Sequence, residues 1–190
     1  MADKPDLTNI PLAFLNPEFL KHPAARPVRI LSEYFEPAER LRRERVHDTI
    51  VFFGSARSLS PEEAAERLAE VEQEIAKAGT VTPELSAART RAETAGRLAR
   101  YYQDALELSR RLTLWSKSLT GNRDFIICSG GSGGMMEAAN RGASIAGGKT
   151  IGFNIELPHE QSVNQYVSRG VAFNFHYFFM RKFWFVYLAK

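Results

Sequence analysis

Four glycines occupy five consecutive positions, Gly130 to Gly134 with Ser132 between them, and they separate an apolar run from a helical pattern. Glycine has no Cβ, so the backbone amides of such a loop can approach an anion closely. The helix that follows adds the positive end of its dipole at the same place. The loop therefore predicts a binding site for a phosphate or a carboxylate, with a strand before it and a helix after it.

The rest of the chain repeats this alternation of strand and helix. Apolar runs predict strands within residues 48–57, 124–128, 149–154 and 171–175, and helical patterns cover Gly134 to Ala146 and begin again near Tyr177. Such alternation indicates a parallel sheet with helices on both faces, in which ligands bind at the carboxyl ends of the strands. We therefore expect an α/β fold of the Rossmann-like, doubly wound type. The loop at Gly54 and Ser55 and the glycine loop should lie at the same edge of the sheet.

A charged helical segment, residues 60–118, separates the first two strands. Ser60 begins a helix that ends at Gly79, a second helix follows a turn at Thr82 and Pro83, and a third pattern runs from Leu98 to Trp115. The segment is longer than one crossover helix needs. We interpret it as an insertion after the first strand that either decorates the sheet or forms a subunit contact.

Six of the nine prolines lie within the first 37 residues. Because proline interrupts helices and central strands, residues 1–36 are expected to form an irregular arm. A short helix is expected from Pro37 to Arg45. We therefore divide the chain into a proline-rich arm with a short helix, residues 1–46, and an α/β domain, residues 47–190, which carries the insertion.

Composition argues against several classes of protein. A net charge of +3 and a pI of about 9.1 are too mild to indicate a nucleic-acid partner. The single cysteine, Cys128, cannot form an internal disulfide, and no Cys/His cluster indicates a metal. The longest apolar run near the end, Phe183 to Ala189, is far shorter than the ~20 residues of a membrane span. We expect a cytoplasmic protein that uses neither membrane nor metal.

Two familiar nucleotide-binding motifs do not fit. A GxGxxG fingerprint that starts at Gly131 would place its third glycine at Met136. The segment GASIAGGKT resembles a Walker A loop, but Ala143 stands where that loop has its first glycine. That segment also follows a helix and precedes a strand, the reverse of a P-loop. A dinucleotide enzyme and a P-loop ATPase are therefore not expected.

Four segments taken together carry a family resemblance: FFGSAR at 52–57, CSGGSGGMMEAANRGA at 128–143, TIGFNIELP at 150–158 and FHYFFMRKFWFVYLAK at 175–190. They resemble the Lonely Guy family, long described as possible lysine decarboxylases and similar to cytokinin riboside 5'-monophosphate phosphoribohydrolases. The resemblance implies hydrolysis of the N-glycosidic bond of AMP or a cytokinin nucleotide, which releases a free base and ribose 5-phosphate. It implies no cofactor, and a homodimer or a higher homo-oligomer. No residue marks a Schiff-base lysine pocket, so decarboxylation is not expected.

The resemblance also implies roles for individual residues. Arg181 matches the family's catalytic arginine. The residues expected to bind the phosphate or the rest of the nucleotide are Gly54, Ser55, Ala56, Gly130, Gly131, Ser132, Gly133, Gly134, Met135, Glu137, Met180 and Lys182.

Each of these polar residues also has a structural interpretation. Arg181 and Lys182 suit the solvated flank of a helix. Ser55 suits a turn, and Glu137 suits the first turn of a helix, where an acid stabilises the dipole. His176, which lies among aromatic residues, is expected in the core, as is Cys128.

Two departures from the family pattern matter. Ser132 stands where the family has a third glycine, with Gly133 offering that freedom one position later. The second glycine motif of the family, PGGxGTxxE, which supplies the catalytic glutamate, would follow one strand after Lys190. The resemblance therefore implies the N-terminal part of a nucleotide-binding domain, C-terminally truncated, with only part of the active site. The alternative is a non-catalytic protein of the same fold that binds or carries a nucleotide or a nucleotide cofactor.

Overall fold

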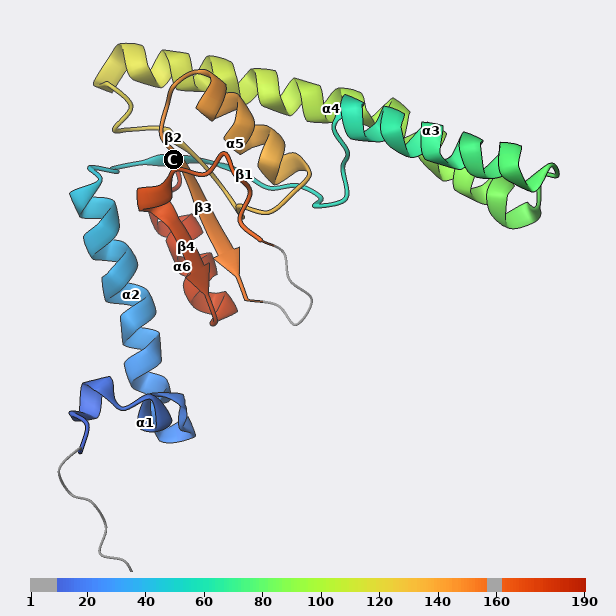
Figure 1. Cartoon of the computed structure of the whole chain (residues 1–190). Helices are drawn as coiled ribbons and strands as arrows, with labels where there is room; N and C mark the ends of the chain where they lie inside the picture. The colour runs from blue at the N-terminus through green and yellow to red at the C-terminus, as the bar shows by residue number, and fades with distance from the viewer. Residues whose placement is uncertain (1–9, 157–161) are drawn as a thin grey trace, which may run out of the picture.

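A computed structural model describes residues 10–156 and 162–190 of the chain. Its centre is a sheet of four parallel strands, β1 (Thr49–Phe52), β2 (Ile126–Ser129), β3 (Thr150–Ile155) and β4 (Ala172–Phe175), in the order β1-β2-β3-β4 (Figure 1). The predicted α/β class, the parallel sheet and the four strand positions are therefore confirmed. Leu157 and Pro158, at the end of the third segment of the family resemblance, lie outside the described residues.

Helices cover both faces of the sheet, because successive residues of a strand point to opposite sides. Cys128 of β2 packs in one cluster with Trp184 of α6 (Phe178–Leu188) and Leu41 of α2 (Arg26–Arg43). Its neighbour Ile127 packs instead against Ala139 of α5 (Met135–Ile145). Figure 1 shows α5 on one side of the sheet and α6 on the other. Two apolar layers thus enclose the strands.

The insertion is a helical hairpin that projects beyond the sheet, as Figure 1 shows. Its first helix, α3 (Pro61–Ala78), begins with a capping box between Ser60 and Glu63. The second and third helical patterns form one helix, α4 (Pro83–Thr120), rather than two. Gly96 lies inside it, but one glycine costs a helix only about 1 kcal/mol relative to alanine. The carboxyl half of α4 packs on α5 and ties the hairpin to the sheet.

The expectation of an irregular arm up to residue 36 is wrong. The described part of that segment holds η1 (Ala13–Leu15), α1 (Pro17–Lys21), η2 (Pro23–Ala25) and the long helix α2, which starts at Arg26 rather than at Pro37. Pro27 lies in the first turn of α2, where its missing N–H is not needed. The other proline of α2, Pro37, lies in the interior of the helix.

A tertiary contact compensates for Pro37. Proline has no N–H, so the carbonyl oxygen of Glu33, four residues earlier, loses its helical donor. The indole Nε1 of Trp184 donates to that oxygen at 2.9 Å. The Glu33 carboxylate in turn accepts the backbone N–H groups of His176 at 2.7 Å and of Tyr177 at 3.1 Å. These bonds attach α2 to α6 and to the two residues that precede it.

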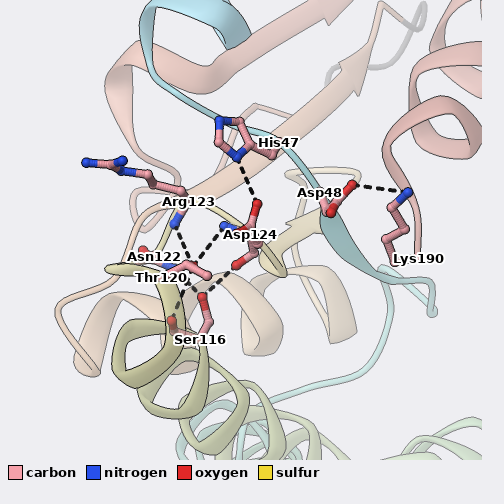
Figure 2. Close-up of polar contacts among 8 residues, drawn as sticks. All are labelled: His47, Asp48, Ser116, Thr120, Asn122, Arg123, Asp124 and Lys190. Atoms are coloured by element: carbon pink, nitrogen blue, oxygen red, sulfur yellow. Dashed lines mark hydrogen bonds and ion pairs between the residues drawn. The ribbon is translucent and has the colours of Figure 1, made fainter.

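A polar cluster fixes the amino end of the sheet, opposite the carboxyl ends where ligands are expected (Figure 2). His47 Nδ1 lies 2.9 Å from a carboxylate oxygen of Asp124, and Ser116 of α4 donates to the Asp124 carbonyl at 2.6 Å. On the other side, Lys190 Nζ lies 3.4 Å from Asp48. The cluster therefore joins the end of α4 and the last residue of the chain to the starts of β1 and β2.

Residues 189 and 190 lie along the edge of β1 that β2 does not occupy. Ala189 forms a parallel bridge with Thr49, and the backbone N–H of Lys190 donates to the Thr49 carbonyl at 3.2 Å. The rest of that edge has no strand partner within the described residues. Among all the residues that the structure describes, no helix combines the length and the apolar character needed to cross a membrane.

Candidate functional site

The glycine loop lies between β2 and α5 and meets the loop that follows β1. Met135 donates its backbone N–H to the carbonyl of Ser55 at 3.0 Å. Gly134 has φ +65° and ψ −134°, a conformation that is close to glycine-only. A Cβ at this position would overlap the carbonyl oxygen of Ser55 and the backbone of Ala56. The structure thus brings together the two loops that the sequence placed at one edge.

Three successive backbone amides of the glycine loop, those of Ser132, Gly133 and Gly134, have no hydrogen-bond acceptor within the described residues. They precede the amino end of α5, which carries the positive end of the helix dipole. Unpaired N–H groups at such a position are suited to bind an anion. The exposed hydroxyl of Ser55, which accepts the N–H of Arg57 at 3.1 Å, keeps its own proton available for a ligand.

Arg181 reaches this loop from α6, on the other face of the sheet. Its Nε donates to the carbonyl of Phe153 at 2.6 Å, and its Nη2 lies 2.5 Å from the point where Gly130 would carry a Cβ. Any larger residue at position 130 would displace the guanidinium. The arginine and the glycine loop, far apart in the sequence, are therefore in contact.

The guanidinium of Arg181 is half-buried and has no carboxylate partner among the described residues. Burial lowers the pKa of Arg181, because desolvation disfavours the charged form. An arginine nonetheless stays protonated. A partly desolvated cation without a counter-ion attracts an anionic ligand, and Arg181 contacts Gly130, the first residue of the loop that carries the free amides.

Cys128 lies fully buried at the end of β2 near this arginine. Burial raises the pKa of its thiol well above the usual value, which keeps the group neutral. The expectation of a core cysteine is confirmed, and the thiol is not a nucleophile in this environment.

The other residues that the sequence predicted for the site, Met135, Glu137, Met180 and Lys182, have different surroundings. Met135 packs against the α4–α5 cluster, and Glu137 accepts a hydrogen bond from the hydroxyl of Tyr102 at 3.0 Å, so its side chain faces α4. Burial is the main reason that the pKa of Tyr102 rises to about 12. Met180 is buried in the core, and Lys182 is exposed with its ammonium 4.9 Å from the ring centre of Phe178.

The sequence had suggested that His176 lies in the core, and this expectation is wrong. Its side chain is exposed, with Nδ1 3.2 Å from the carboxylate of Glu156. The reason is its position between β4 and α6, where the neighbouring aromatic Phe175 points into the core and the alternation of the strand turns His176 outward.

An apolar groove of about 550 Å³ adjoins Arg181 between α6 and the free edge of β1. Its other lining residues are Val51, Phe53, Phe178, Lys182, Phe185, Val186 and Ala189. Phe53, which directly follows β1, is 76% exposed and adds a large apolar surface to this groove. Arg181 thus separates a loop suited to an anion from a surface suited to an apolar or planar group.

Sequence reasoning missed two asparagines that hold the glycine loop, Asn140 and Asn164. Asn140 is fully buried in α5, and Asn164 donates to carbonyl groups of the loop. The signal for Asn140 was its place among alanines in the middle of a helix, where asparagine is a poor helix former. Asn164 lies in a polar loop, and nothing in the sequence around it marks the contact.

Within the described part of the chain, no group of three His, Cys, Asp or Glu side chains could hold a metal ion. The chain matches no protein-family model and no curated protein sequence. The geometry of the site is therefore the basis for assigning a function.

Proposed function

We propose that this chain carries the phosphate-binding part of a nucleoside 5'-monophosphate phosphoribohydrolase that acts on AMP or a cytokinin nucleotide. The main observation that supports this proposal is the half-buried guanidinium of Arg181, which has no carboxylate partner in the described structure and contacts the glycine loop at Gly130. The free amides of Ser132, Gly133 and Gly134 complete the surroundings of an oxyanion. The family resemblance supplies the substrate.

In this proposal the 5'-phosphate binds to the free amides at the start of α5, and Arg181 orients the ribose and the phosphate as a cation of fixed charge. The reaction breaks the bond between C1' of the ribose and the base nitrogen. The base takes the electron pair and a proton, and the oxygen of water bonds to C1'. The transition state resembles an oxocarbenium ion, so a carboxylate near C1' is needed.

We place the part of the site that supplies this carboxylate at the free edge of β1. Ala189 already forms a parallel bridge there, on the side opposite β2. A further strand at that position would reverse the strand order beside β1 and make the sheet doubly wound in the Rossmann-like sense. Ligands of such sheets bind where the order reverses. The proposal includes a cytoplasmic homo-oligomer, for which the exposed aromatic residues of α6, among them Phe179 and Tyr187, offer a contact face.

A second candidate is a nucleotide-binding or carrier protein without turnover. One observation favours it: the carboxylate of Glu137, the acid nearest in sequence to the glycine loop, faces Tyr102 of α4. Bound nucleotide would then remain intact.

The two candidates separate in one experiment. The protein is titrated with AMP and with isopentenyladenosine monophosphate by calorimetry, and each mixture is then chromatographed for free base. Arg181→Met should weaken binding of either nucleotide by about tenfold to hundredfold, the effect of losing a hydrogen bond to a charged group. Arg123→Met is the control, because it removes the same charge at the opposite end of the sheet, where Figure 2 shows that side chain making no polar contact.

Binding with release of base supports the hydrolase, and binding without release supports the carrier. Equal affinities for wild-type protein and Arg181→Met would contradict both, since both assign the anion to this cation.

A further inference from the structure

Asn164, from the segment between β3 and β4, donates three hydrogen bonds to carbonyl groups of the glycine loop. Its side-chain Nδ2 donates to the carbonyl oxygen of Gly131 at 3.0 Å and to that of Ser132 at 2.9 Å. Its backbone N–H also donates to the Gly131 carbonyl at 2.7 Å. Two successive peptide groups of the loop therefore have their carbonyl oxygens turned toward Asn164.

A second asparagine, Asn140 of α5, holds the first one. Its Oδ1 accepts the Nδ2 of Asn164 at 2.9 Å and the hydroxyl of Ser129 at 2.7 Å. Its own Nδ2 donates to the hydroxyl of Thr150 at 2.7 Å and to the carbonyl of Ile151 at 3.2 Å. Both ends of the buried amide are thus occupied, and the network links the loop to β2, β3 and α5. A network in which each member has a partner restricts its members to one arrangement.

The orientation of these carbonyls decides where the neighbouring amides point. In a trans peptide group, the C=O of one residue and the N–H of the next point in opposite directions. Because the Gly131 carbonyl faces Asn164, the N–H of Ser132 faces away from it, and the same holds for the Ser132 carbonyl and the N–H of Gly133. These two amides are among the three that have no acceptor in the described structure.

We propose that Asn164, supported by Asn140, is a positioning residue of the anion site, which it serves by turning two carbonyl dipoles inward so that a phosphate monoester meets only N–H groups. The inference rests on the proposed function, because it concerns the same loop. A free glycine-rich loop could rotate these peptide groups and present carbonyl oxygens, which repel an anion. Asn164 removes that alternative without touching the ligand.

The test compares Asn164→Asp and Asn164→Ala with wild-type protein, with inorganic phosphate and AMP as probes. Asn164→Asp has nearly the same shape, but a carboxylate cannot donate to the two carbonyls and adds a negative charge behind the loop. Phosphate affinity should fall by tenfold or more, in line with the loss of hydrogen bonds worth about 1 kcal/mol each plus charge repulsion. The matched controls are Gln165→Glu and Gln165→Ala, since Gln165 is exposed and its side chain makes no hydrogen bond or ion pair within the described residues.

Amide resonances give a residue-specific readout. In wild-type protein the N–H signals of Ser132 and Gly133 should shift on addition of phosphate. In Asn164→Ala the backbone N–H of residue 164 still holds the Gly131 carbonyl, whereas the Ser132 carbonyl is released. The Gly133 signal should then lose more of its phosphate-induced shift than the Ser132 signal does. A purely structural role would lower the melting temperature and leave the affinity of the folded protein unchanged.

Several results would overturn the inference. One is equal phosphate affinity in wild-type protein and in a folded Asn164→Asp or Asn164→Ala variant. If neither variant folds, the titration of wild-type protein decides. The inference is then contradicted if phosphate leaves the N–H signals of Ser132 and Gly133 unshifted, or if phosphate does not bind. Phosphate binding without base release contradicts the hydrolase alone and leaves the role of Asn164 standing.

Discussion

Among the glycines of the loop, leaving aside Gly130 with its contact to Arg181, Gly134 should be the one whose replacement by alanine destabilises the protein most. Gly134 adopts φ +65° and ψ −134°, and forcing an alanine into this region costs about 1 to 3 kcal/mol. The new methyl group would also overlap backbone atoms of Ser55 and Ala56, which cannot rotate away as a side chain can. Separation of the loops would break the bond from Met135 to Ser55, worth about 1 kcal/mol.

The expected loss is therefore about 2 to 4 kcal/mol in the free energy of unfolding. Urea denaturation followed by circular dichroism measures it. Gly133→Ala is the matched control, because a Cβ there meets nothing closer than the Ala56 carbonyl oxygen at 3.7 Å and its φ is not positive. Equal unfolding free energies for the two variants would refute the argument that the close approach of the two loops requires glycine at position 134.

Two further predictions concern the support of the sheet. Trp184→Phe keeps an aromatic ring but removes the donor to the Glu33 carbonyl, so the free energy of unfolding should fall by about 1 to 3 kcal/mol for the unpaired acceptor. Adding Pro37→Ala restores a helical N–H and should recover most of this loss. Additive effects of the two substitutions in urea denaturation would disprove the compensation. Lys149 lies 2.8 Å from Glu44 and, chiefly through that hydrogen bond, lowers the pKa of the carboxyl from 4.5. The pair therefore stabilises the folded state above that pH and loses this effect as the pH falls through the lowered folded pKa. The difference in melting temperature between wild-type protein and Glu44→Gln should be largest near pH 7 and shrink toward pH 3, and a difference independent of pH would contradict this assignment.

The strands and the two loops at their carboxyl ends were predictable because their signals are local. A short apolar run such as Ile126 to Cys128 favours a strand buried on both faces of a sheet, and four such runs in a chain that alternates strands with helices favour a parallel arrangement. The start of α3 after its N-cap, Ser60, was also predictable, since the capping box involves residues three positions apart.

The helix α2 was not predictable from local signals. Pro37 argues against a continuous helix, and the carbonyl that it leaves unpaired finds its donor in Trp184, far along the sequence. The same holds for the candidate site. The family resemblance pointed to Arg181, but its contact with Gly130 and its lack of a carboxylate partner in the described structure depend on the packing of α6 against β3. Asn164 carries no sequence signal because a polar loop residue is ordinary until its partners are known.

The sequence by itself determined the positions of the four strands, the parallel sheet and the position of the glycine loop at its carboxyl edge. These follow from periodicity, capping and the absence of side chains on glycine, which act over a few residues. The tertiary structure alone decided which charge faces the loop, which way its peptide groups turn and how a proline is accommodated inside a helix. Those outcomes depend on hydrogen bonds between segments distant in the chain, and they exist only once the sheet has brought the segments together.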